Sequence, residues 1–260
     1  MTKSRVLQKL RSGGFVKVAG VSRVTEPWLI EVIGGIGYDV VWFDMEHRPF
    51  GFDKIDPISL ACRATGMDLM VRIRKTGYES PMRALEFGAN GLMIPHCHSA
   101  AEARQWVEWT RFPPLGKRGM DGAGADADYG SADMQEYLKH AREEVFLVLQ
   151  IEDKEAVECI EDIAAVEGVD LLFIGPGDLS LSYGVPFQFD HPLLQKATER
   201  VAEAVRKAGK WWGTTSGTPE AAQRALDLGA RMITAGGDHG ALVNGLRNSF
   251  QEFGKIGIKP

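Results

Sequence analysis

The feature that most constrains this fold is a repeated alternation of short apolar runs with longer amphipathic stretches. Short runs rich in β-branched residues predict strands, and apolar residues at helical spacing predict helices. The predicted strands are 15–21, 39–45, 68–74, 91–96, 145–151, 170–175, 211–215 and 231–235. The predicted helices are 26–35, 53–65, 80–88, 99–110, 154–166, 191–208, 218–229 and 239–253. Eight such units of about 32 residues each predict an α/β fold, a closed (β/α)8 TIM barrel that forms a single domain over residues 1–260.

An open, doubly wound sheet is the alternative architecture for this alternation. It is disfavoured because no GxGxxG fingerprint follows an early strand and because the count of units is eight. One long interruption, 112–144, separates the fourth and fifth strands and contains a helical pattern near 131–143. Loops of this length in compact domains are usually functional or mobile.

Composition excludes several classes of function. The 260 residues carry 30 Lys and Arg against 35 Asp and Glu, a net charge of −5, which argues against nucleic acid and anionic membranes as partners. No apolar run approaches the roughly 18 residues of a membrane span, and residues 1–14 lack the apolar core of a secretory signal. We therefore expect a cytoplasmic protein. The three cysteines are widely spaced and suggest neither a disulfide framework nor a thiolate zinc site.

Polar residues collect where the predicted strands end. Barrel enzymes carry their chemistry at the carboxyl ends of the strands. The residues at these ends are Asp44, Glu46, His47, Arg72, Arg74, His96, His98, Gln150, Glu152 and Asp178. The strand starts also carry Asp39, Asp68 and Asp170, so charge is not exclusive to one end of the barrel.

Glu152 and Asp178 are the candidate metal ligands. They lie 26 residues apart, about one strand–helix unit, at the ends of neighbouring strands that run roughly 5 Å apart. Two carboxylates so close share either a proton or a cation, and oxygen ligands suit Mg²⁺ or Mn²⁺. The glycines around Pro176 would let backbone N–H groups approach a ligand. The alternative is that one acid caps a helix and the other is solvated.

His47 and Arg72 are the candidate groups for proton transfer and charge stabilisation. His47 follows Asp44 by three residues, so the carboxylate could orient the imidazole for general acid–base work, or the histidine could simply be exposed. The Arg72 guanidinium projects from a buried strand and requires either a neighbouring carboxylate or an anionic ligand. Arg74 shares its face and could be a solvent-exposed copy.

Two further motifs carry weaker signals. His96 and His98 share a strand face and could form a metal pair, but Pro95 and Ser99 indicate that the strand has already ended. The glycine-rich segment 235–240 occupies a place where barrels often bind phosphate, although glycines there equally serve a turn.

The chain resembles the HpcH/HpaI aldolase family, the metal-dependent pyruvate-type aldolases. The resemblance covers nearly the whole chain in order: FDMEH at 43–47, VR at 71–72, RFPPLGKRG at 111–119, QIE at 150–152, FIGPGDLS at 173–180 and GARMITAGGDHGAL at 229–242.

This resemblance implies a class II aldolase that reversibly cleaves a 4-hydroxy-2-oxo acid to pyruvate, or a close analogue, and an aldehyde. It implies a divalent cation, Mg²⁺ or Mn²⁺ with Co²⁺ possible, bound by Glu152 and Asp178. Arg72 would contact the keto oxygen, and His47, paired with Asp44, would handle protons. Gln150 would lie at the pyruvyl group, and backbone N–H groups near Gly177 and Asp178 would hold the carboxylate.

The resemblance also implies a homo-oligomer, a hexamer built as a trimer of dimers, in which each barrel exchanges its last helix with a partner. The chain departs from the family pattern at Met45, at His96 and at Glu86, where some relatives place an aspartate near a neighbouring subunit's site. These departures concern the choice of aldehyde more than the enolate chemistry.

Three other functions are alternatives for this set of residues. Oxaloacetate decarboxylation needs the same cation and Arg72 but no aldehyde. A Schiff-base aldolase needs a desolvated lysine inside the barrel, whereas Lys17 lies within the first strand and Lys75 at the rim. A catalytically silent barrel that senses a metabolite would be expected to have lost these polar residues.

Overall fold

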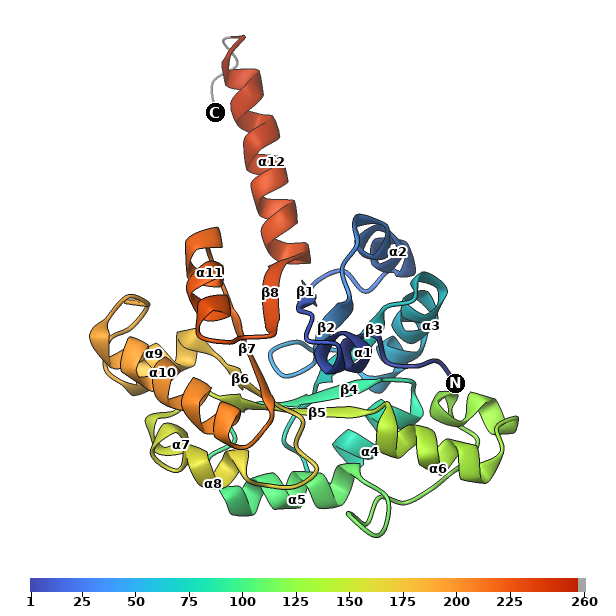
Figure 1. The fold of residues 1–260 in the computed structure, drawn as a ribbon. Coiled ribbons are helices and arrows are strands. Elements are labelled where there is room, and N and C mark those ends of the chain that lie inside the picture. The colour runs from blue at the N-terminus through green and yellow to red at the C-terminus, as the bar shows by residue number, and fades with distance from the viewer. Residues whose placement is uncertain (257–260) are drawn as a thin grey trace.

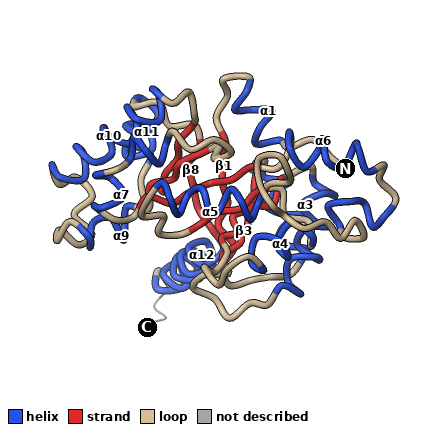
Figure 2. The backbone as a smooth tube through the Cα atoms, turned by 90° about the horizontal axis from the view of Figure 1, so that it is seen from below, coloured by secondary structure: helices blue, strands red, loops and turns tan. Residues whose placement is uncertain are grey.

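The computed structural model describes residues 1–256, so the last four residues of the predicted domain lie outside the described residues. Eight parallel strands close into a barrel in sequence order, β1 to β8, with β8 pairing to β1. The strands are β1 (Val16–Val21), β2 (Val40–Asp44), β3 (Asp68–Arg72), β4 (Gly91–Ile94), β5 (Phe146–Ile151), β6 (Leu171–Ile174), β7 (Trp211–Thr215) and β8 (Met232–Gly237). The predicted barrel is confirmed, and Figure 2 shows its strands at the centre with helices around them.

Helices follow the strands as predicted. They are α1 (Arg5–Arg11), α2 (Pro27–Ile36), α3 (Ile55–Thr65), α4 (Glu79–Glu86), α5 (Ala100–Thr110), α6 (Met134–Glu143), α7 (Lys154–Glu158), α8 (Ile160–Ala164), α9 (Pro176–Ser182), α10 (Pro192–Lys207), α11 (Pro219–Asp227) and α12 (Asp238–Gly254), with 3₁₀ helices at Phe52–Lys54 and Ala125–Gly130. Side chains cap several of them, as when Ser99 accepts from the N–H of Glu102 at the start of α5.

One predicted helix needs correction, and two helices were not predicted. The helix expected over 154–166 is two short helices, because the backbone of Cys159 leaves the helical region between α7 and α8. Helix α9 was not predicted; it begins at Pro176, since a proline suits the first turn of a helix. Helix α1 was not predicted at all.

Two apolar layers stabilise the barrel. One fills its interior and includes Val40, Met70 and Phe173; the other lies between the strands and the surrounding helices. Helix α1 contributes Val6, Leu7 and Leu10 to the interior layer at the end where the strands begin. The chain therefore plugs the amino-terminal end of its own barrel and leaves the other end for polar residues.

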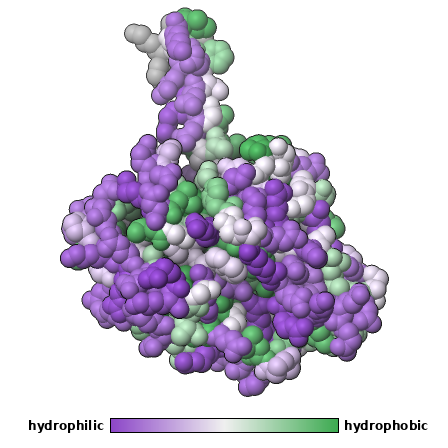
Figure 3. All heavy atoms as spheres, viewed as in Figure 1, coloured by the Kyte–Doolittle hydropathy of each residue, from purple (hydrophilic) through white to green (hydrophobic). Residues whose placement is uncertain are grey.

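Helix α12 differs from the other helices because it extends away from the barrel (Figure 1). Its single buried residue is Asp238, while Leu246, Phe250 and Phe253 are all more than half exposed. Figure 3 shows apolar side chains along one side of this projecting helix. No helix in residues 1–256 is both long and apolar enough to cross a membrane.

Candidate active site at the carboxyl end of the barrel

Arg72 is the centre of a buried ionic network. It ends β3 directly beside Asp44, the last residue of β2, because the two strands pair in that register. Its Nε–H donates to Asp44 Oδ1 at 3.0 Å, and its Nη2 lies 2.9 Å from Oδ2, while Nη1 lies 3.1 Å from Glu46 Oε2. A buried guanidinium needs such partners to offset its desolvation. Arg72 therefore has the carboxylate partner that its position on a buried strand requires.

Asp44 is occupied by Arg72 rather than by the imidazole of His47. Burial by itself would raise the pKa of the Asp44 carboxyl, but the hydrogen bond and charge of Arg72 hold that pKa below its ordinary value. Asp44 Oδ1 also accepts the backbone N–H groups of Glu46 and His47. The His47 side chain is 52% exposed, and its Nε2 lies 3.6 Å from Glu46 Oε2. The expected Asp44–imidazole pair is therefore replaced by a contact through the backbone of His47.

Glu152 follows β5 and is the most buried acid of this rim, with 2% of its surface exposed. Its Oε1 accepts from the Gln150 amide at 3.1 Å, and its Oε2 accepts from the backbone N–H of His96 at 3.2 Å. Gln150 Oε1 in turn lies 3.5 Å from Arg72 Nη1, a weak contact that links Glu152 to the Arg72 network. The end of β3 and the segment that follows β5 therefore meet in one polar cluster.

Burial raises the pKa of Glu152 to about 7, and the charge of Asp178 adds to this rise against the opposing effects of His96 and Arg72. Asp178 stands in the first turn of α9, which starts directly after β6. Gly175 makes room for the glutamate, since a Cβ there would lie 2.1 Å from Glu152 Oε1. A Cβ on Gly177 would meet nothing within 4 Å, so the backbone at this turn is open to a ligand.

These residues fit a divalent cation. The site has four acids, Asp44, Glu46, Glu152 and Asp178, and their negative charge exceeds the single positive charge of Arg72. Among the described residues, no lysine or arginine lies within ion-pair distance of Glu152. Within residues 1–256, no group of three or more His, Cys, Asp or Glu side chains forms a ready metal cage. A pair of carboxylates with open positions suits Mg²⁺ or Mn²⁺, which keep several water ligands.

Some residues at this rim were not singled out as site residues. Glu46 bridges Arg72 and His47, and its place between Asp44 and His47 in the strand-end cluster was the available signal. His96 has a positive φ of 45°, and its Nδ1 lies 3.1 Å from Asp153 Oδ2, while His98 contacts the same carboxylate. Trp42 lies under Arg72, with the guanidinium carbon 4.9 Å from its ring centre, and nothing in the sequence indicated this contact.

The glycine-rich segment 235–240 contains a buried carboxylate, that of Asp238. Asp238 is 4% exposed and accepts from the backbone N–H groups of Ser22, Arg23 and Val24. A carboxylate of segment 235–240 thus accepts the free N–H groups of the β1–α2 loop. The segment 235–240 serves the closure of β8 onto β1.

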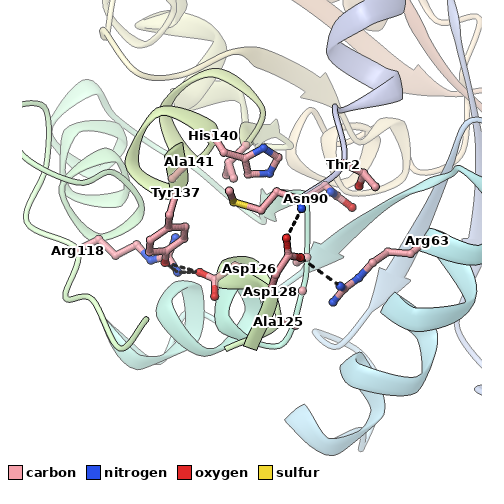
Figure 4. Close-up of a pocket in the computed structure, with 14 residues that line it drawn as sticks. Thr2, Arg63, Asn90, Arg118, Ala125, Asp126, Asp128, Tyr137, His140 and Ala141 are labelled. Carbon is pink, nitrogen blue, oxygen red and sulfur yellow. Dashed lines mark hydrogen bonds and ion pairs between the residues drawn. The ribbon is translucent and has the colours of Figure 1, made fainter. Parts of the chain in front are cut away.

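A second polar pocket lies between α3, the 3₁₀ helix 125–130 and α6 (Figure 4). Arg118 is almost fully buried there and pairs with Asp126, which also accepts from the hydroxyl of Tyr137 at 2.6 Å. Arg63 pairs with Asp128 across the same pocket. Because Asp126 and Asp128 are each paired with a cation, this cluster anchors the long 112–144 segment rather than resembling the acid-rich rim.

The closed barrel, with buried acids around Arg72 at the carboxyl ends of its strands, has the architecture of a (β/α)8 enzyme. The family model described as HpcH/HpaI aldolase/citrate lyase matches residues 22–245. The chain belongs to this family, which is a metal-dependent one, and it is a carbon–carbon lyase of the aldolase type.

Three similar proteins illustrate the relationship. A hydroxypyruvate/pyruvate aldolase of Pseudomonas aeruginosa is 34% identical over 94% of this chain and 90% of its own length. A 2-keto-3-deoxy-L-rhamnonate aldolase of Salmonella gallinarum is 35% identical over 82% of this chain and 80% of its own. A crystal structure of an HpcH/HpaI aldolase from Desulfitobacterium hafniense superposes with a TM-score of 0.90 at 30% identity, covering 97% of this chain and 96% of that one.

Proposed function

We propose that this protein is a metal-dependent class II aldolase that reversibly cleaves a 4-hydroxy-2-oxo acid to pyruvate, or a close analogue, and an aldehyde. The observation that carries the proposal is the linked cluster in which Gln150 lies between the Arg72 guanidinium and the buried Glu152 carboxylate. Cleavage next to a ketone leaves an enolate, so the site must stabilise negative charge on the former keto oxygen. The aldolase names of the two curated relatives support the same chemistry.

Glu152 and Asp178 are proposed to hold the cation, Mg²⁺ or Mn²⁺ with Co²⁺ possible. When bound, the cation supplies fixed positive charge that polarises the keto group of the substrate. Glu152 is preorganised for this role because Gln150 and the His96 backbone already hold its two oxygens. The backbone N–H groups near Gly177 and Asp178 would hold the substrate carboxylate, in the open space beside Gly177.

Arg72 is proposed to donate a hydrogen bond to the keto oxygen as it gains charge. Asp44 and Glu46 fix the guanidinium from two sides, so little reorganisation is needed during the reaction. Gln150 would lie at the pyruvyl group. Asp44 therefore contributes by orienting Arg72 and the backbone at His47.

His47 is proposed to move the proton of the substrate hydroxyl. In cleavage its imidazole would remove the C4 hydroxyl proton, and in synthesis it would return a proton to the aldehyde oxygen. Its half-exposed position next to Glu46 leaves the ring accessible to substrate or to a water molecule.

The test is synthesis of the aldol product from pyruvate and an aldehyde with Mn²⁺ or Mg²⁺. We expect product that disappears with EDTA and returns when metal is added in excess. Insensitivity to chelation would contradict the metal assignment. Measuring oxaloacetate decarboxylation on the same preparation separates the aldolase from a decarboxylase, because a dedicated decarboxylase would be faster on oxaloacetate than on any aldol substrate.

We further propose that α12 is exchanged between subunits of a homo-oligomer, as expected for a hexamer built as a trimer of dimers. Its apolar side chains have no cover within residues 1–256, and α2 exposes Trp28, Val32 and Ile36 at helical spacing. A second copy of the chain provides the matching apolar face. Phe250→Glu should shift the molar mass by light scattering towards the monomer; an unchanged mass would contradict the exchange.

A single domain over residues 1–260 and a cytoplasmic location also stay predictions. Limited proteolysis that releases no stable internal fragment, and recovery of the protein in the cytoplasmic fraction, would support them.

A further inference from the structure

Trp42 occupies an unusual position inside the barrel. It lies in β2 and packs against the interior apolar layer, with its ring edge-on to Phe173 at 5.5 Å between centroids. Its indole Nε1 is buried and has no hydrogen-bond partner among the described residues. Buried tryptophans usually satisfy this N–H group. A leucine or phenylalanine at this position would avoid the cost of burying an unpaired N–H group. We therefore expect the indole to make a favourable contact that those two side chains would make less well.

The compensation is the Arg72 guanidinium, whose carbon lies 4.9 Å from the centre of the Trp42 ring. Tryptophan has the strongest attraction for cations of the aromatic side chains. Among the described residues, Arg72 is the only cation recorded over this ring. The contact therefore joins the apolar interior of the barrel to the polar rim above it.

The hydrogen bonds of Arg72 leave the donors of Nη2 available. A guanidinium has five N–H donors in one plane. Nε–H donates to Asp44 Oδ1, and Nη1–H donates more weakly to Gln150 Oε1. Asp44 Oδ2 and Glu46 Oε2 lie within ion-pair distance of Nη2 and Nη1. Nη2 makes no hydrogen bond in the described part of the chain. All of these carboxylate and amide contacts act at the edges of the plane, so they leave both faces of the guanidinium to other neighbours.

We propose that Trp42 is a positioning residue that sets the tilt of the Arg72 guanidinium and so directs its free N–H at the oxygen of the bound oxo acid. The inference rests on the proposed function, because it takes Arg72 as the group that stabilises the enolate oxygen. The guanidinium carbon lies over the indole ring, and Phe173 packs edge-on against the same indole. The effect belongs to the charge-developing step, so it changes kcat more than KM.

The test compares Trp42→Leu, which removes the aromatic face, with Trp42→Phe, which keeps a smaller one. Trp211→Leu and Trp211→Phe are the matched controls, since Trp211 packs against the same interior layer and no cation over its ring is recorded in residues 1–256. The reaction to follow is Mn²⁺-dependent exchange of the pyruvate methyl protons with deuterium by NMR. This reaction needs enolate formation but no aldehyde. Mn²⁺ affinity by calorimetry and Tm report on the metal ligands and on packing.

We expect Trp42→Leu to lower kcat for exchange about tenfold, equivalent to about 1.4 kcal/mol, with Mn²⁺ affinity unchanged. Trp42→Phe should recover most of this loss, and both Trp211 variants should keep the wild-type rate. Equal losses in the two Trp42 variants, an unchanged rate in Trp42→Leu, or the same loss in Trp211→Leu would each overturn the inference. Absence of exchange in the wild-type enzyme would instead contradict the proposed function.

Discussion

The two ends of the barrel carry the same type of residue in different environments. At the amino-terminal end, Asp39 is fully buried and pairs with Arg5 Nε at 2.9 Å and Lys9 Nζ at 2.8 Å. Asp170 likewise pairs with Arg111 and accepts the N–H of Leu147. These acids hold α1 and the loops beneath the strands in place.

At the carboxyl end, Glu152 is as deeply buried but meets only an amide and a backbone N–H at hydrogen-bond distance. Arg72, the buried guanidinium at this rim, is already shared by Asp44 and Glu46. The comparison shows that burial alone does not distinguish a functional acid from a structural one. Among Asp39, Asp170 and Glu152, the difference is that the first two have a lysine or arginine within ion-pair distance and Glu152 does not.

The largest effect should come from Glu152→Gln. The amide keeps the size of the side chain and removes the charge proposed to bind metal, so we expect aldolase activity to fall about 10³-fold with little change in Tm. Turnover assays and thermal unfolding measure the two quantities. Asp170→Asn is the control at the other end, and it should lower Tm while activity per folded molecule remains. If Glu152→Gln lost stability but kept its activity, Glu152 would be a structural acid like those at the amino-terminal end.

Asp68 tests the amino-terminal end further, because its partners are neutral donors, the hydroxyl of Ser4 and the N–H of Val6. Burial raises the pKa of Asp68 from 3.8 to about 6. The folded protein therefore binds more protons than the unfolded chain between these values, and stability falls as pH rises from about 4 to 6, by about 3 kcal/mol. Asp68→Asn should remove this slope in denaturant unfolding measured across that range. If the free energy of unfolding changed with pH in the same way in Asp68→Asn and in the wild-type protein, the raised pKa would not belong to Asp68.

His47→Ala should reduce the rate of aldol cleavage about 10²-fold, the usual contribution of a general base. Metal affinity and Tm should hold, since the side chain is half exposed. His98→Ala is a close control because that histidine is 51% exposed at the same rim and contacts Asp153 instead. Equal losses in the two variants would argue against a specific role for His47.

The smallest effect should come from Asp39→Asn. It removes the ion pairs with Arg5 and Lys9, whose side chains are more than a third exposed, so we expect a loss of about 2 kcal/mol in the free energy of unfolding. The loss should shrink at high salt, and activity per folded molecule should not change. Reduced turnover in the folded variant would show that the two ends are coupled.

Much of the fold could be predicted because the period of apolar residues is a local property. Each strand of the barrel is a short apolar run, and the observed boundaries lie within two residues of those expected. Helix α1 escaped prediction because its seven residues are too few to show a period; its apolar residues are instead selected by the barrel interior. Helix α9 also escaped prediction, because it has only seven residues and Gly177 is a poor helix former, although Pro176 suits the first turn of a helix.

The sequence by itself determined the barrel and the residue types at the strand ends, because side-chain alternation and strand length are written along the chain. Only the tertiary structure decided the partners. Register between β2 and β3 brings Arg72 to Asp44, which displaces the imidazole of His47 from that carboxylate. Closure of the barrel puts the Gln150 amide between Arg72 and Glu152, and puts the Trp42 ring against Arg72. Such contacts depend on distances between chain segments, which no local pattern contains.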